Sequence, residues 1–130
     1  MEIIIISDSH GNISNFKFVM MFAKKIKAKA VIHCGDWDNL KTAQAALSFK
    51  LPLYAVLGNA DTDTKIDNFL KAKAKRFEKN FLVFEIEGRR IGVIHNCQYL
   101  DSAIGSLNLD IVFCGHRHFK FQKSILHLES

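Results

Sequence analysis

Short runs of β-branched apolar residues alternate with helix-forming segments through the first half of the chain. The runs cover residues 3–6, 30–34 and 53–57, and a cluster rich in Gly, Asp or Asn follows each of them. Segments with apolar residues at helical spacing come next along the chain. This order of strands and helices is typical of an α/β fold with a largely parallel sheet.

Three helices are expected to accompany these strands. Ser14 can cap the first helix, whose core-facing side is predicted to contain Phe18, Met21, Phe22 and Ile26. The second helix is predicted over residues 39–49, ahead of the single proline, Pro52. A shorter third helix is predicted over residues 64–72.

The second half of the chain predicts antiparallel pairing as well. Residues 81–86 alternate between two faces, and Glu87, Gly88 and Arg89 form a turn into a strand over residues 91–94. A helix is expected over residues 100–106, and further strands over residues 110–114, 119–121 and 125–128. The fold should therefore contain mixed sheets.

Length and composition limit the class of protein. With 130 residues and 48% apolar content, the chain is expected to form one domain over residues 1–130. No apolar run reaches the roughly 18 residues of a membrane-spanning helix, and the start shows no export signal, so we expect a cytoplasmic protein without membrane contact. Cys34, Cys97 and Cys114 form no CxxC pair, which favours unpaired thiols in a reducing compartment.

The formal net charge of +5 comes mostly from lysines in residues 24–29 and 71–79. We interpret these lysines as solvated helix and loop faces. The alternative is that they attract nucleic acid or another polyanion. No aromatic stacking motif in the sequence supports that alternative.

Polar residues able to bind a metal follow five of the apolar runs. In open α/β sheets the ligand site lies outside the carboxyl ends of the strands, so these residues can converge on one site. The set contains two Asp, one Asn and four His, namely Asp8, His10, Asp36, Asn59, His95, His116 and His118.

Oxygen and imidazole ligands without thiolates suit borderline divalent metals. We expect two ions, with manganese as the first choice and nickel, iron, cobalt or zinc as alternatives. Side chains two residues apart on an extended segment share a side, so the pairs Asp8/His10 and His116/His118 can straddle ions roughly 3.5 to 4 Å apart. The remaining positive charge would attract a phosphate ester, which a metal-bridging hydroxide could attack.

The ordered motifs resemble those of the calcineurin-like metallophosphoesterases, and most closely the small prokaryotic phosphodiesterases. They are Asp8-Ser9-His10-Gly11-Asn12, Gly35-Asp36, Gly58-Asn59-Ala60-Asp61, His95 and Gly115-His116-Arg117-His118. The resemblance implies an αββα sandwich of mixed β-sheets that hydrolyses a phosphodiester or a phosphomonoester. It assigns the first metal to Asp8, His10 and His118, the second to Asn59, His95 and His116, and the bridging position to Asp36. Catalytic roles are expected for Asp36, Asn59 and His116.

The chain departs from the family pattern at Ala60, where larger relatives carry a catalytic histidine. No side chain at this position can protonate the leaving group, so leaving groups of low pKa should be preferred. Asn96 replaces a usual glycine, and an Asn tolerates the same backbone. Compared with the family pattern, we expect the C-terminal strands to be abbreviated, and a homodimer could cover the sheet edge that this would leave.

Several alternatives stay open at this stage. The chain could be a catalytically weak or inactive scaffold for protein interactions, as in the vacuolar sorting relative of retromer. His33 is expected in the core or behind the metal ligands. Trp37 and Asp38 either line the cleft or pack on the next helix. Asn12 either contacts phosphate or forms a turn, and Arg117 is expected to point away from the metals.

Overall fold

The computed structural model describes residues 2–7, 9, 13–96, 98, 108–115 and 122–127. The first half of these residues alternates strands and helices, and the second half contains strands. In chain order the elements are β1 (Glu2–Ser7), α1 (Ile13–Lys25), β2 (Ala30–His33), α2 (Leu40–Ser48), β3 (Leu53–Ala55), α3 (Thr64–Lys73), β4 (Arg76–Phe77), β5 (Phe81–Ile86), β6 (Arg89–Asn96), β7 (Ile111–Gly115) and β8 (Gln122–His127).

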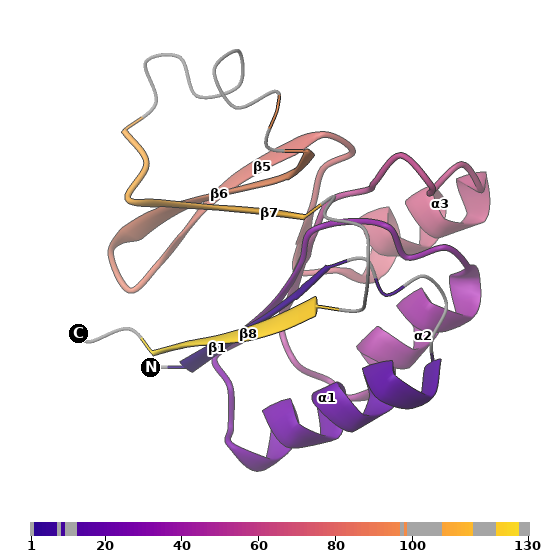
Figure 1. The fold of residues 1–130 in the computed structure, drawn as a ribbon, viewed down its shortest axis with the longest axis horizontal. Coiled ribbons are helices and arrows are strands. Elements are labelled where there is room, and N and C mark those ends of the chain that lie inside the picture. The colour runs from indigo at the N-terminus through magenta and orange to yellow at the C-terminus, as the bar shows by residue number, and fades with distance from the viewer. Residues whose placement is uncertain are drawn as a thin grey trace.

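The strands form two sheets that are stacked in layers with the helices (Figure 1). One sheet has the order β4-β3-β2-β1-β8, in which β1 to β4 are parallel and β8 is antiparallel to β1. The other has the order β5-β6-β7, with β5 antiparallel and β7 parallel to β6. The predicted α/β fold with mixed sheets is therefore confirmed. The helix expected over residues 100–106 and the strand expected over residues 119–121 lie outside the described residues.

Two apolar cores lie on opposite faces of the five-stranded sheet. Ile4 and Ile6 of β1 pack in the core that contains the buried side chains of the helices. Ile3 packs in the core between the sheets, together with Leu82 of β5 and Val93 of β6. Because successive strand residues point to opposite faces, the run of isoleucines in β1 supplies both cores.

Local sequence signals explain several element boundaries. Asn39 caps α2, and its side-chain oxygen accepts a hydrogen bond from the Thr42 N–H at 3.0 Å. Glu87 and Gly88 have φ angles of 52° and 77°, as the tight turn between the antiparallel strands β5 and β6 requires. Ser14 lies inside α1, which begins at Ile13, so the prediction that Ser14 caps this helix is wrong.

The prediction of which side of α1 faces the core is wrong, because the buried side is rotated about the helix axis from the predicted one. The buried residues are Phe16, Val19, Met20 and Ala23, whereas Phe18 and Met21 are 68% and 63% exposed. Phe22 and Ile26 are half-buried at the edge of the core. The helix is apolar on more than one side, so helical spacing alone did not distinguish the two faces.

Two further observations concern the length of the helices and the state of the cysteines. None of the helices in the described parts of the chain is long and apolar enough to cross a membrane. Cys34 is buried and forms no disulfide, but Cys114 is disulfide-bonded. The prediction of unpaired thiols is therefore wrong for Cys114.

The orientation of α1 can be tested with two matched substitutions. We expect Phe16→Ala to lower the free energy of unfolding by about 3 to 5 kcal/mol, because it leaves a cavity under the helix. Phe18→Ala should change it by less than about 0.5 kcal/mol. Urea denaturation followed by circular dichroism measures both values. A larger loss from Phe18→Ala than from Phe16→Ala would contradict this orientation.

Candidate metal centre

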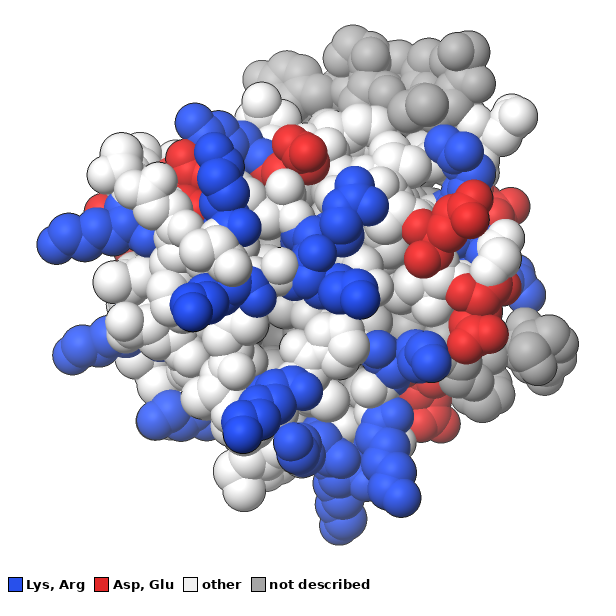
Figure 2. Space-filling view, turned by 180° about the vertical axis from the view of Figure 1, so that it is seen from behind, with Lys and Arg blue, Asp and Glu red and all other residues white. Residues whose placement is uncertain are grey.

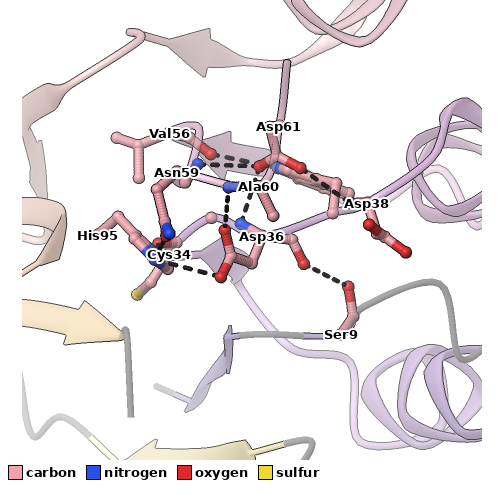
Figure 3. A network of polar contacts seen from close by, with 12 residues as sticks. Ser9, Cys34, Asp36, Asp38, Val56, Asn59, Ala60, Asp61 and His95 are labelled. Carbon is pink, nitrogen blue, oxygen red and sulfur yellow. Dashed lines mark hydrogen bonds and ion pairs between the residues drawn. The ribbon is translucent and has the colours of Figure 1, made fainter. Parts of the chain in front are cut away.

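Three of the predicted site residues come together where strands of the two sheets end on the same side (Figure 3). Asp36 lies three residues after the end of β2, and Asn59 lies four residues after the end of β3. His95 is the penultimate residue of β6 in the other sheet. Asp36 is 1% exposed and His95 is 6% exposed, while Asn59 is exposed. The site therefore spans the junction between the sheets.

The loop that carries Asp36 has an unusual backbone. Gly35, Asp36 and Asp38 have φ angles of 102°, 65° and 77°, all in the left-handed region. A Cβ atom at Gly35 would lie 2.7 Å from the backbone N of Gly58 and 2.8 Å from Nδ1 of His95. A Cβ atom at Gly58 would overlap the Asp36 carboxylate. Both glycines are therefore required by the close approach of the two loops.

The carboxylate of Asp61 holds these two loops together. Its Oδ2 accepts hydrogen bonds from the backbone N–H groups of Asp36 at 2.8 Å and Gly58 at 2.9 Å. Its Oδ1 accepts a hydrogen bond from the N–H of Asp38 at 2.8 Å. Asp61 is 8% exposed, so these charge-assisted bonds form away from bulk water. They fix the left-handed backbone at Asp36 and Asp38 against the turn that carries Asn59.

The fixed backbone aims the side chain of Asp36 at the centre of the site. Its Oδ1 accepts a hydrogen bond from the N–H of Ala60 at 3.0 Å. Its Oδ2 lies 3.3 Å from Nε2 of His95, which is also 3.0 Å from Oδ1 of Asn59. One imidazole nitrogen therefore faces two side-chain oxygens.

The orientation of His95 determines what these atoms can bind. Its Nδ1 lies 2.8 Å from the carbonyl oxygen of Cys34. A carbonyl oxygen only accepts, so Nδ1 carries the proton of this contact and a neutral ring has its lone pair on Nε2. Three electron-pair donors then converge, from His95, Asp36 and Asn59. The two oxygens would be satisfied by a proton on Nε2, and all three donor atoms would be satisfied by a cation bound between them.

The donor set fits a divalent cation. Two atoms that bind one ion at about 2.1 Å each, at a right angle, lie about 3 Å from each other. The distances from Nε2 of His95 to the oxygens of Asn59 and Asp36, 3.0 and 3.3 Å, are close to this value. Within the described ranges, no group of three or more His, Cys, Asp or Glu residues could hold a metal by itself. A complete metal centre would therefore need ligands from outside these ranges.

The other four predicted ligands lie outside the described residues. They are Asp8, His10, His116 and His118. Asn12 and Arg117, for which the sequence left alternatives, also lie outside them. The strands that lead to these ligands are described, since β1 ends at Ser7 and β7 ends at Gly115. Gly115 pairs with Asn96 of β6, next to His95.

A buried network behind the site connects the loops after β1 and β2. His33 is fully buried, and its Nδ1 accepts a hydrogen bond from the Gly35 N–H at 3.0 Å. Its Nε2 is 3.1 Å from Oγ of Ser9, which lies between two predicted ligands in the sequence. The Ser9 hydroxyl also donates to the carbonyl oxygen of Asp36 at 3.4 Å. The core position predicted for His33 is confirmed.

Trp37 packs in the core beside this network and does not line a cleft. Its side chain is fully buried, and its ring stacks on His33 with centroids 3.6 Å apart. Its Nε1–H donates to the carbonyl oxygen of Val56 at 3.2 Å. Of the two alternatives that the sequence left for Trp37, packing is therefore confirmed and lining the cleft is excluded. Asp38 is exposed.

Sequence reasoning missed Asp61 as an organising residue. It was visible only as the last residue of the Gly58-Asn59-Ala60-Asp61 motif, with no role of its own. An Asp at the end of a glycine-led turn is a usable signal, because its carboxylate can accept backbone N–H groups of the same turn. The bonds from residues 36 and 38 could not be foreseen, since they join loops that lie far apart in the sequence.

Comparison with known proteins identifies related sequences and folds. Residues 1–126 match the calcineurin-like phosphoesterase superfamily domain. The chain is 28% identical over 122 residues to phosphodiesterase MJ0936 of Methanocaldococcus jannaschii, an alignment that covers 91% of this chain and 74% of that protein. The solved structure of a novel archaeal phosphodiesterase has a TM-score of 0.78 and 27% identity, covering 92% of this chain and 75% of that chain.

A more distant solved structure shares the fold alone. Vacuolar protein sorting 29 from Cryptosporidium parvum has a TM-score of 0.63 and 18% identity, covering 91% of this chain and 65% of that chain.

The role of Asp61 predicts a loss of stability on a conservative change. Asp61→Asn keeps one acceptor but cannot accept all three backbone N–H groups, so we expect the free energy of unfolding to fall by about 1.5 to 3 kcal/mol. Asp63→Asn is the matched control, because Asn caps a helix as well as Asp and should preserve the cap of α3. Chemical denaturation measures both variants. Equal stabilities for the two variants would contradict the role assigned to Asp61.

Proposed function

The chain belongs to the calcineurin-like phosphoesterase superfamily, and on this premise we propose that it hydrolyses a phosphodiester, or a phosphomonoester, with two divalent metal ions. The proposed ligands are Asp8, His10, Asp36, Asn59, His95, His116 and His118. Manganese is the proposed metal, with nickel, iron, cobalt or zinc as alternatives. The similarity to an archaeal phosphodiesterase, in sequence and in solved structure, supports the diester as the first substrate to test.

The convergence of Asp36, Asn59 and His95 is the observation that carries this proposal. Their facing atoms are two oxygens and one nitrogen, separated by 3.0 and 3.3 Å. The strand ends support the remaining ligands, because Ser7 directly precedes Asp8 and Gly115 directly precedes His116. Parallel strands end at the same edge of a sheet, so the described end of β1 lies at the edge where β2 leads to Asp36, and that of β7 at the edge where β6 carries His95.

The protein's own groups are arranged to support phosphate chemistry. When bound, two divalent ions would lower the pKa of a water ligand and stabilise negative charge on the phosphate. Asp36 is proposed as the residue shared by both ions, and the N–H of Ala60 fixes its other oxygen. The carbonyl of Cys34 orients His95 so that Nε2 faces the site. Asn59 is exposed, so it could meet a substrate. His116 is another proposed catalytic residue of the set.

We propose that the leaving group receives its proton from water. Ala60 lies beside the centre, but its methyl side chain cannot donate a proton, and its N–H is already bound to Asp36. Esters whose leaving groups are stable as anions would therefore react fastest.

The same feature favours the alternative function, which is a weakly active or inactive scaffold for protein interactions. Its fold-level support is the likeness to vacuolar protein sorting 29. Absence of turnover in a metal-loaded protein would favour this alternative.

The metal proposal predicts the behaviour of ligand variants. The purified protein should contain two equivalents of divalent metal and should hydrolyse bis(p-nitrophenyl) phosphate when manganese is supplied. Asp36→Asn and His95→Ala should each lower kcat/KM by about a hundredfold or more and reduce the bound metal. Elemental analysis and steady-state kinetics measure these effects.

Asp63→Asn is the control for these variants, since Asp63 caps α3 and belongs to no proposed metal ligand set. It should keep wild-type metal content and turnover. The proposal fails if both ligand variants retain the turnover of the wild type.

The missing proton donor predicts a dependence on the leaving group. Across a series of aryl and alkyl phosphodiesters, kcat should fall steeply as the pKa of the leaving group rises. Ala60→His should flatten this dependence and raise the rate for alkyl esters by roughly a hundredfold, because an imidazole can act as general acid. Ala60→Asn, which fills similar space without a titratable proton, should keep the steep dependence. Identical slopes in the His and Asn variants would disprove this account.

A further inference from the structure

A groove of about 480 Å³ lies outside the candidate metal centre. Residues from the end of α3, from β4 and from the turn into β5 line it, namely Lys71, Phe77, Glu78, Lys79, Asn80 and Phe81. Its volume lies within the range of roughly 300 to 1,000 Å³ in which small-molecule sites fall. None of these residues belongs to the proposed metal ligands.

Backbone hydrogen bonds connect this groove to the loop that carries Asn59. The N–H of Leu57 donates to the carbonyl oxygen of Lys79 at 3.2 Å, and the N–H of Glu78 donates to that of Ala55 at 3.2 Å. Leu57 precedes Asn59 by only two residues, a backbone distance of at most about 7 Å. A substrate whose phosphate is at the metal centre could therefore extend into the groove.

The groove combines ammonium groups with aromatic rings. Lys71 and Lys79 supply the charges, and Phe77 and Phe81 are both half-buried. The Nζ of Lys79 lies 3.3 Å from Oδ2 of Asp67, so its side chain is held at the groove although it is 63% exposed. Ammonium groups attract phosphates, and nucleobases stack on aromatic rings.

The surroundings of the groove are basic. Residues 71–79 contain five Lys or Arg and one Glu, a net charge of +4 by subtraction. All five basic side chains are exposed. Figure 2 shows that Lys and Arg side chains predominate on the face turned away from the viewer of Figure 1, while most of the acidic ones lie toward its right side. The exposed basic side chains of residues 71–79 would therefore attract a polyanion toward the groove.

We propose that the groove binds a nucleotide unit of a single-stranded nucleic acid, with a base against Phe77 and Phe81 and the adjoining phosphates against Lys71 and Lys79. This inference rests on the proposed function only in making the bound strand the substrate. The binding itself needs no turnover. The groove also contains the aromatic surface for which the sequence showed no motif. Its two rings come from different strands, β4 and β5, so the sequence pattern did not reveal them.

Binding of a short fluorescent single-stranded oligonucleotide, measured by anisotropy in the presence of a chelator, tests this inference. We expect affinity to fall steeply with rising salt. Lys71→Glu should weaken binding by about tenfold, and Phe81→Leu by about fivefold, since leucine keeps the apolar volume but removes the stacking face. Thermal unfolding checks that both variants remain folded.

Lys17→Glu is the matched control, because Lys17 is an exposed lysine of α1, a helix on the far side of α2 from α3. It should bind the oligonucleotide within about twofold of wild type, since exposed charges beyond roughly 8 Å are screened at physiological salt. If Lys17→Glu and Lys71→Glu weaken binding equally, or if the wild type does not bind at low salt, the inference is overturned.

Photochemical cross-linking locates the base independently. An oligonucleotide that carries 5-iodouracil should cross-link within residues 77–81, as mapped by mass spectrometry. Cross-links confined to other segments would overturn the inference. Hydrolysis of the aryl phosphodiester by the wild type, measured in parallel, separates the two claims. Groove binding without turnover rejects only the proposed function. Turnover without groove binding rejects only this inference.

Discussion

The carboxylate of Asp61 is the constraint on which the geometry of the candidate centre depends. It accepts three backbone N–H groups from two loops that follow neighbouring parallel strands. Without such an acceptor, the left-handed backbone at Asp36 and Asp38 would carry a conformational cost and leave buried donors unsatisfied. With it, the Asp36 side chain points toward His95, and the turn that bears Asn59 closes over it.

The second constraint is the packing of one sheet on the other. Asp36 and Asn59 follow strands of the five-stranded sheet, but His95 belongs to β6 of the three-stranded sheet. The core between them, with Ile3, Leu82 and Val93 among its members, fixes the distance across which the donors meet. Gly35 makes this approach close, because any larger residue would contact His95. The centre is therefore a product of tertiary packing as much as of its loops.

The residues that supply donor atoms differ from those that hold the loops in place. Asp36, Asn59 and His95 provide the donors, whereas His33, Ser9 and the backbone around Gly35 hold the loops from behind. Ala60 contributes a backbone N–H and no side-chain proton. Under the proposed function, selectivity would then depend on the leaving group and on surfaces beyond the candidate centre. Residues 78–80 join one such surface to the loop of Asn59.

The sequence by itself determined the α/β class, most strand positions, the β5–β6 hairpin and the family, because strand periodicity, turn glycines and ordered motifs are local signals. It also named the three donors that the structure brings together. Only the tertiary structure decided which side of α1 is buried, since that helix is apolar on more than one side. The same holds for the burial of Trp37, the two-residue strand β4 and the bonds of Asp61, because each depends on partners distant in the chain. Packing selects among the options that local patterns leave open.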